Sequence, residues 1–221
     1  MEFGKAFSFV FEDSDWPRKV LIAALILLIP IIGELVVLGW ALNISKNVME
    51  GNPKPLPDVD FGADLARGFM GFVIGFVYAL PITLMAIFLA IVDAILANSA
   101  NSNAALTAIT VVYSCFGLVS LVYGIAVWLI IPAAYTNYLA KGNLGAALHL
   151  GEVFGMVRSN IGAYFIVLLG GIVAGFIASL GVIACVIGVL ATSAYSYAIL
   201  GHLFGQSYLE ANKAVPAAVV E

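Results

Sequence analysis

Among the residues that could do chemistry, Glu34 stands out because its carboxylate interrupts a long apolar stretch. The stretch Val20–Trp40 carries no other charge. An ionisable group at membrane depth costs several kcal/mol unless it finds a partner, so such residues commonly handle protons or ions. Glu34 is therefore the candidate ion or proton site. If the chain instead turns back near a membrane surface at this point, the carboxylate is merely solvated.

Two arginines, Arg67 and Arg158, each precede a long apolar segment. A guanidinium in that position can bind the phosphate of a lipid headgroup through paired hydrogen bonds. The same placement is also typical of a basic side chain that extends from the end of a span toward water. Contact with lipid phosphate is therefore one interpretation of both residues, and this extension toward water is the other.

Catalytic motifs are missing from the sequence. It contains no HExxH or GxSxG pattern and no phosphate-binding loop. The two histidines, His149 and His202, are isolated and cannot form a metal site without acidic ligands. Cys115 and Cys185 lie within apolar runs, which is typical of small packing residues. We therefore expect no catalytic residue, no metal, no cofactor and no enzymatic activity.

The composition indicates that lipid surrounds most of the chain. Its 221 residues are 63% hydrophobic and only 10% charged, whereas soluble domains carry about 25% charged residues. The mean hydropathy of +1.09 agrees. A net charge of −4 without a basic patch excludes a nucleic-acid partner. The expected partners are the lipid bilayer and either other membrane protein subunits or a second copy of the chain.

Long uncharged stretches predict the membrane-spanning helices. Residues 69–92 and 106–132 contain 24 and 27 uncharged residues, each enough to cross a hydrocarbon core of about 30 Å. Residues 161–203 are 43 uncharged residues, too many for one span, so we expect a turn near Gly181. The predicted fold is an all-α, polytopic integral membrane helix bundle. Short interfacial helices are expected at residues 3–13 and 144–158.

The first apolar stretch leaves two alternatives. Pro30 and Gly33 both weaken a helix, so Val20–Trp40 is either one kinked span, giving five spans, or a re-entrant hairpin followed by four spans. The hairpin places all nine Lys and Arg residues on one side, and the single span divides them six to three. Positive charges concentrate in the cytoplasm, yet re-entrant hairpins are rarer than kinked spans, and both alternatives remain. Either one places the carboxyl terminus in the cytoplasm.

A weak internal repeat relates residues 16–92 to 107–183 within a single membrane domain, 1–221. At an offset of 91 residues, Gly51-Asn52 matches Gly142-Asn143 and Arg67 matches Arg158. Such repeats are common in membrane transporters. Because glycine-rich sequences also align by chance, the repeat is a hypothesis.

Pairs of glycines four residues apart predict where helices approach closely. Small residues allow two helices to come near enough in lipid for van der Waals packing. The glycines expected at helix-packing surfaces are Gly71, Gly75, Gly171, Gly175, Gly201 and Gly205. Their spacing does not distinguish packing within the chain from packing against another subunit.

Several short motifs resemble a known family. They are Asp15-Trp16, the run Ile29–Gly33, Gly39-Trp40, Gly51-Asn52-Pro53 and Leu56-Pro57-Asp58, followed by Phe61 and Gly68-Phe69. The chain resembles the uncharacterised prokaryotic membrane family catalogued as domain of unknown function 4013. It departs from the family where Trp40 replaces a frequent tyrosine. The resemblance implies a multi-pass protein of a prokaryotic cytoplasmic membrane, without a known activity or any binding residue.

Two functions are compatible with these features. The first is a non-catalytic accessory or scaffold subunit that packs against other membrane proteins. This function agrees with the missing catalytic motifs and with the glycine pairs that predict close helix packing. The second is a small-solute or ion transporter, a channel or a lipid-handling protein. It suits the helix-weakening residues Pro30, Gly33 and Pro81 and the possible repeat.

Overall fold

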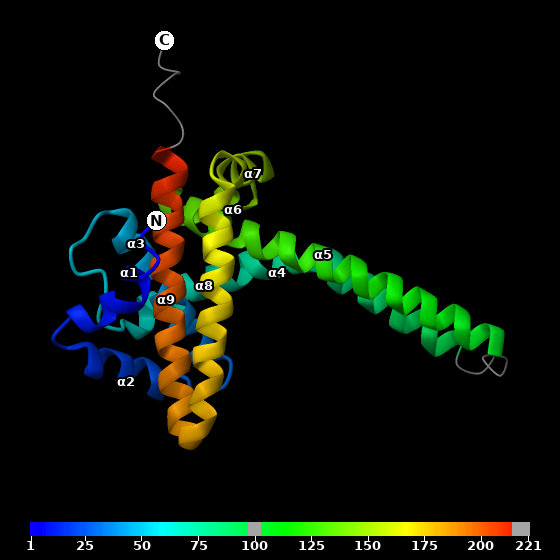
Figure 1. Ribbon diagram of the computed structural model, residues 1–221, viewed down its shortest axis with the longest axis horizontal. Helices are drawn as coiled ribbons and strands as arrows, with labels where there is room; N and C mark the ends of the chain where they lie inside the picture. Colours follow the sequence, from blue (N-terminus) through cyan, green and yellow to red (C-terminus); the bar gives the residue numbers. More distant parts are fainter. Residues whose placement is uncertain (97–102, 214–221) are drawn as a thin grey trace, which may run out of the picture. The chain divides into compact units, whose positions relative to one another are not determined.

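The computed structural model describes residues 1–96 and 103–213, with the side chains of 95–96, 103–105 and 184–186 left out. Every regular element in these ranges is a helix (Figure 1). In chain order they are α1 (Lys5–Ser8), the 3-10 helix η1 (Phe9–Glu12), α2 (Trp16–Ile26), α3 (Ile32–Met49), α4 (Phe61–Leu96), α5 (Asn103–Lys141), α6 (Leu144–Leu148), α7 (Leu150–Ser159), α8 (Ile161–Leu180), η2 (Gly181–Ala184) and α9 (Cys185–Lys213).

Within the described residues, four helical segments are long and apolar enough to cross a membrane. They are Phe61–Ala94, Leu106–Lys141, Ile161–Ile183 and Ile187–Lys213. The expectation of an all-α membrane helix bundle is thereby confirmed. The 3-10 helix η2 connects α8 to α9 where the sequence predicted a turn.

The chain divides into two compact units, Met1–Ile74 with Leu129–Glu221, and Gly75–Trp128. The second unit is a hairpin made of parts of α4 and α5. The Tyr123 hydroxyl donates a hydrogen bond of 2.6 Å to the carbonyl oxygen of Tyr78 across this hairpin. Hydroxyls of Thr83 and Ser114 bond to carbonyls one turn earlier in their own helices. The single-domain interpretation and the internal repeat stay predictions.

In the first unit, α9 is the central helix, and α8 and α3 pack on two of its faces (Figure 1). Toward α8, the Ser196 hydroxyl donates a hydrogen bond of 2.7 Å to the carbonyl oxygen of Ala174. Toward α3, Gly201 lies against the backbone of Ala41. Residues 196 and 201 are five positions apart, which at 100° per residue puts them on nearly opposite sides of α9.

Further faces of α9 contact the amino-terminal segment, residues 1–12, and the end of α5. The Tyr195 hydroxyl donates a hydrogen bond of 2.6 Å to the carbonyl oxygen of Phe7. The ring of Phe204 lies 6.0 Å from that of Tyr135, centroid to centroid. Contacts on all these sides explain why Ala198, Ile199 and Leu203 of α9 are fully buried.

The first apolar stretch is broken between α2 and α3. Helix α2 ends at Ile26 and α3 begins at Ile32, and Ile31 adopts a φ of 65° that β-branched residues rarely tolerate. The turn makes its own hydrogen bonds, because the N–H groups of Leu28, Ile29 and Gly33 all donate to carbonyls within the segment. The break therefore contains Pro30, as the sequence indicated, and Gly33 is the second residue of α3.

The two ends of this broken stretch lie next to each other. The Lys19 ammonium donates a hydrogen bond of 2.8 Å to the carbonyl oxygen of Leu56, and Arg18 forms an ion pair with Asp58. Residues in the first turn of α2 thus touch residues in the loop after α3. The α2–α3 segment folds back on itself, as a hairpin does.

The proline-rich loop after α3 is held by side chains that bond to three successive carbonyl oxygens. Proline has no N–H group, so this loop offers mainly acceptors. The donors are Asn47 Nδ2 to Pro55 at 3.0 Å, Lys19 Nζ to Leu56 at 2.8 Å and Trp40 Nε1 to Pro57 at 3.0 Å.

Two helices end in the same way. Gly51 follows α3 with a φ of 71°, and Gly142 follows α5 with a φ of 67°. Glycine tolerates this left-handed conformation, which commonly ends helices. An asparagine follows each glycine, so the motif that suggested the repeat ends a helix in both places.

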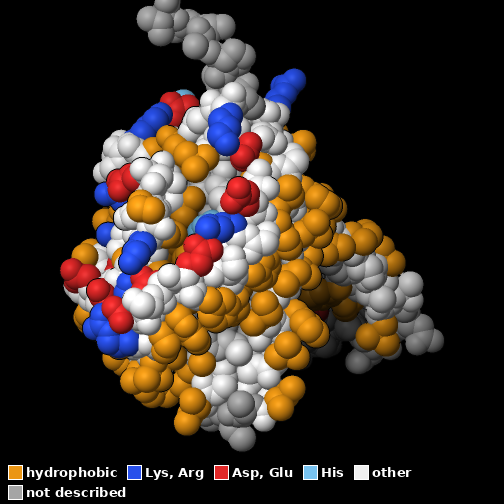
Figure 2. All heavy atoms as spheres, turned by 60° about the vertical axis from the view of Figure 1, so that its left-hand side comes forward, with side chains coloured by type: hydrophobic (Ala, Val, Ile, Leu, Met, Phe, Trp, Pro, Cys, Tyr) orange, Lys and Arg blue, Asp and Glu red, His pale blue; other side chains and the backbone are white. Residues whose placement is uncertain are grey.

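Charged side chains gather on one part of the molecular surface. In Figure 2 they occupy the upper part of the view, and hydrophobic side chains cover much of the lower part. All nine Lys and Arg residues belong to the first unit. This separation of charge from apolar surface is expected of a protein that is partly embedded in lipid.

Candidate functional site

Glu34 lies in the first turn of α3 and contacts α9. The Tyr197 hydroxyl donates a hydrogen bond of 2.8 Å to Glu34 Oε2. The amino-terminal end of a helix carries partial positive charge, which stabilises a carboxylate. Glu34 therefore has one hydroxyl donor and a favourable helix dipole, although its side chain is exposed.

Tyr197 places this carboxylate beside an apolar span. It is ten residues into the candidate span Ile187–Lys213, about 15 Å along the helix axis at 1.5 Å per residue. The tip of the α2–α3 segment is exposed and apolar, with Ile31 at 78% exposure. Glu34 is thus an ionisable group at a level occupied by apolar side chains.

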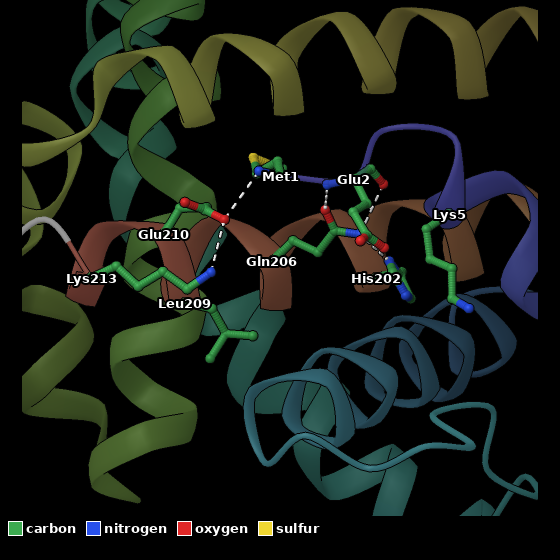
Figure 3. Close-up of a pocket in the computed structure, with 8 residues that line it drawn as sticks. All are labelled: Met1, Glu2, Lys5, His202, Gln206, Leu209, Glu210 and Lys213. Carbon is green, nitrogen blue, oxygen red and sulfur yellow. Dashed lines mark hydrogen bonds and ion pairs between the residues drawn. The ribbon is translucent and has the colours of Figure 1, made fainter.

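A cavity of about 340 Å³ lies between the amino-terminal segment and the carboxyl-terminal half of α9 (Figure 3). The side chains around it mix cations, carboxylates and apolar groups. They belong to Met1, Glu2, Lys5, His202, Gln206, Leu209, Glu210 and Lys213.

Gln206 connects the amino-terminal segment to α9. Its Oε1 accepts a hydrogen bond of 2.8 Å from the backbone N–H of Glu2, and its Nε2 donates one of 3.1 Å to the Glu2 carbonyl oxygen. These two bonds determine the orientation of the amide, because a flipped amide would face donor with donor and acceptor with acceptor. Gln206 is buried, with 8% of its surface exposed.

The imidazole of His202 lies between Gln206 and Phe9. Its Nδ1 is 3.0 Å from Gln206 Nε2, and its ring is stacked on Phe9 with centroids 4.4 Å apart. Because Gln206 Nε2 is a donor in the orientation that Glu2 determines, His202 Nδ1 must accept. The ring hydrogen of the neutral imidazole is then on Nε2. The structure therefore assigns His202, which sequence analysis left isolated, to a buried polar cluster.

The cationic groups of the cavity are paired with carboxylates. The Met1 amino group and Lys213 Nζ lie 3.0 and 3.2 Å from Glu210 Oε1. Lys5 Nζ donates hydrogen bonds of 2.9 and 2.8 Å to the two Glu12 oxygens. The Glu12 carboxylate raises the pKa of Lys5 above its ordinary value.

The two predicted lipid-contact arginines have different surroundings. Arg67 forms an ion pair with the buried Asp64 and a hydrogen bond of 3.4 Å with the carbonyl oxygen of Gly39. Its guanidinium therefore makes contacts within the chain. Arg158 lies in the last turn of α7 and is exposed, so its guanidinium is accessible.

The predicted packing glycines fall into three groups. Methyl groups on Gly201 and Gly205 would overlap the α3 backbone at Ala41 and Ser45, and one on Gly71 would come within 2.9 Å of Leu42. Gly175 has no atom within 4 Å of such a methyl group. Of the remaining two, Gly171 is buried within α8 and Gly75 is half-buried in the second unit.

A close helix contact that the glycine spacing did not predict joins α3 to the start of α4. A methyl group on Gly39 would overlap the carbonyl oxygen of Asp64, and one on Gly68 would overlap that of Leu35. Both glycines occur in the motifs that carried the family resemblance. Their separation of 29 residues hides the pair from any search for glycines on one helix face.

Among the described residues, no group of three or more His, Cys, Asp or Glu side chains is arranged to hold a metal ion. Cys115 is a free, exposed thiol in the second unit, and the side chain of Cys185 lies outside the described set.

The motif residues of the resemblance thus form one module, made of the α2–α3 segment, the proline-rich loop and the start of α4. The model of the family "Protein of unknown function (DUF4013)" matches residues 22–187. The chain belongs to this family. Its match includes most of the module and extends through α8, which confirms the expected resemblance. No curated protein and no solved structure matches the chain significantly.

Proposed function

We propose that this protein is a non-catalytic accessory or scaffold subunit that packs against other membrane proteins. The observation that carries the proposal is the bonding of several hydroxyl groups in the apolar spans. Hydroxyls of Thr136, Ser179, Thr192 and Ser196 all bond to backbone carbonyls of the chain. A transport pathway needs polar groups directed at a passing solute, and these are directed at the backbone.

The outer face of α8 supplies a surface for a partner helix. Six apolar residues three or four positions apart form a continuous exposed stripe along the whole helix, with exposures from 44% to 65%. They are Ile161, Phe165, Leu169, Ile172, Phe176 and Leu180. Residues at this spacing share one helix face, and in lipid such a face packs through van der Waals contact.

We further propose that the α2–α3 segment is a re-entrant hairpin and that four helices cross the membrane. The contacts of Lys19 with Leu56 and of Arg18 with Asp58 support this, because they bring both ends of the segment together. The internal hydrogen bonds of the turn lower the cost of placing it in lipid. All nine Lys and Arg residues then lie in the cytoplasm of a prokaryotic cell, and so does the carboxyl terminus.

The accessory role is tested by gentle detergent extraction from native membranes, followed by native mass measurement and identification of what co-migrates. A stoichiometric complex with other membrane proteins is the expected result. A lone monomer or a homo-oligomer would overturn the proposal.

The topology is tested with single cysteines at Asp15 and Lys54, which are both exposed, in a chain lacking Cys115 and Cys185. A membrane-impermeant maleimide should label both positions from the same side of sealed vesicles. Labelling from opposite sides would show that the first segment crosses the membrane once.

A second candidate function, proton or ion transport, is favoured by the Tyr197–Glu34 hydrogen bond at the level of an apolar span. The test is proton flux into vesicles that contain the purified protein. Transport through this site requires that Glu34→Gln abolish the flux and that Glu50→Gln, on the exposed end of α3, leave it unchanged. A wild-type protein without flux would remove this candidate.

A further inference from the structure

We propose that the cavity beside α9 binds a phosphate group, and that His202 Nε2 donates a hydrogen bond to a phosphate oxygen. This inference does not depend on the accessory role. It starts from the Gln206 amide, whose orientation is determined by the backbone of Glu2. That orientation makes His202 Nδ1 an acceptor and leaves the ring hydrogen on Nε2.

The Nε2–H group of His202 is a donor without a partner among the described residues. The imidazole as a whole is only 4% exposed and is stacked on Phe9. Nε2 is nevertheless not one of the fully buried unpartnered atoms, so it keeps some access to solvent, and His202 lines the cavity. A donor in such a partly dehydrated place bonds most strongly to a charged acceptor.

Each cationic group that lines the cavity is paired with a carboxylate, and the partner of Lys5, Glu12, is not among the lining residues. The lining includes three cationic groups, those of Met1, Lys5 and Lys213, and two carboxylates, those of Glu2 and Glu210. Lys5 extends from α1 and Lys213 from the last turn of α9 (Figure 3). The Lys5 side chain is 43% exposed, so its ammonium can turn from Glu12 to an anion bound at His202 at little cost. Lys213 lies 11 residues beyond His202, about 17 Å along α9.

The position of the cavity suits the phosphate of a membrane lipid, and a free phosphate offers the same chemistry. His202, Gln206 and Lys213 lie in the last part of the candidate span Ile187–Lys213, where a helix leaves the hydrocarbon for the headgroup region. The apolar side chains of Met1 and Leu209 also line the cavity. Its volume of about 340 Å³ is within the range of small-molecule sites.

The decisive measurement uses the imidazole itself. The chain has two histidines, and His149 is 67% exposed on the surface, so the variant His149→Phe leaves His202 as the one histidine signal. With ¹⁵N-labelled histidine in a maltoside detergent, NMR should show a protonated Nε2 and an unprotonated Nδ1. Adding a phosphate ligand should then shift the Nε2 resonance in a saturable way.

Three probes distinguish the sources of the phosphate. They are inorganic phosphate, dioleoylphosphatidylglycerol and a galactosyl diacylglycerol, which has no phosphate. A shift with the phospholipid alone indicates a headgroup site, and a shift with inorganic phosphate indicates a site for the free anion. Both results support the proposal. No shift with either phosphate probe, or an equal shift with the galactolipid, overturns it.

Lysine variants test the charges without removing the imidazole. We expect Lys5→Gln to weaken binding about tenfold, because it removes a charge-assisted hydrogen bond, and Lys213→Gln to weaken it less, because Lys213 lies 11 residues beyond His202 on α9. The matched control is Lys54→Gln, which changes an exposed lysine on the proline-rich loop. Unchanged affinity in the Lys5 variant, or equal weakening in the control, would refute this role of Lys5.

Discussion

Trp40 Nε1 donates a hydrogen bond of 3.0 Å to the carbonyl oxygen of Pro57. Trp40 is fully buried in α3, and its hydrogen bond is one of three from side chains to successive carbonyl oxygens of the proline-rich loop. The indole therefore serves both as core packing and as a donor that holds the loop against α3.

Replacing this indole tests its donor role. Trp40→Phe keeps a large aromatic ring but leaves the Pro57 carbonyl without its donor, so we expect a loss of about 1–3 kcal/mol in unfolding free energy. Chemical unfolding in detergent measures the loss, and limited proteolysis should show faster cleavage within residues 52–60. Trp128→Phe, at a 44% exposed site, is the control. Equal stability of the two variants would contradict a structural role for the hydrogen bond.

The tight contact of α9 with α3 predicts different effects at two glycines. Gly201→Ala places a methyl group against the Ala41 backbone, and overpacking of this kind costs about 1–3 kcal/mol. Gly175→Ala meets no atom within 4 Å and should leave stability unchanged or raise it slightly, because alanine favours helix. Thermal unfolding in one detergent compares them. Equal destabilisation by both would show that α9 does not pack on α3 in this register.

The ion pair of Lys19 and Asp13 is buried, with side-chain exposures of 11% and 10%. Lys19→Met leaves the Asp13 carboxylate buried without its cation, and we expect a loss of about 3–5 kcal/mol. The double variant with Asp13→Asn should recover much of this loss. Lys5→Met, in the exposed pair with Glu12, is the control and should change stability little. A single Lys19 variant as stable as the double one would refute the coupling.

The same pair predicts a dependence of stability on pH. The hydrogen bond from Lys19 holds the pKa of Asp13 below its ordinary value of 3.8. The folded state therefore binds this proton less readily than the unfolded state does. The resulting stabilisation is complete above the unfolded pKa and is lost as the pH falls through the lower folded pKa. The difference in unfolding free energy between wild type and Asp13→Asn, measured from pH 7 downward, should begin to narrow near about pH 4 and keep narrowing at lower pH. A constant difference would contradict this linkage.

The sequence predicted the helical membrane fold and the weak point at Pro30 and Gly33, because both depend on local chemistry. Apolar length predicts spans directly, and proline and glycine weaken helices wherever they occur. What the chain does at a weak point depends on distant partners. The contact between Lys19 and Leu56 that closes the hairpin joins residues 37 positions apart, and no local pattern indicates it.

The polar cluster was not predictable for a related reason. His202 and Gln206 are one helical turn apart, which is a visible signal, but their meaning depends on the backbone of Glu2, 204 residues away from Gln206. Gly39 and Gly68 show the same difficulty for packing. Glycine spacing within one helix favoured Gly175, yet the closest approaches involve glycines on separate helices.

The central position of α9 has a consequence for biosynthesis. Helix α9 is the last helix described, and it packs against α1, α2, α3 and α8. Until the ribosome has made it, residues such as Val37, Trp40 and Ile44 lack the surface that buries them. The amino-terminal half of the protein therefore emerges first but reaches its final packing only after translation of α9. Meanwhile it depends on the insertion machinery or on lipid to cover its apolar faces.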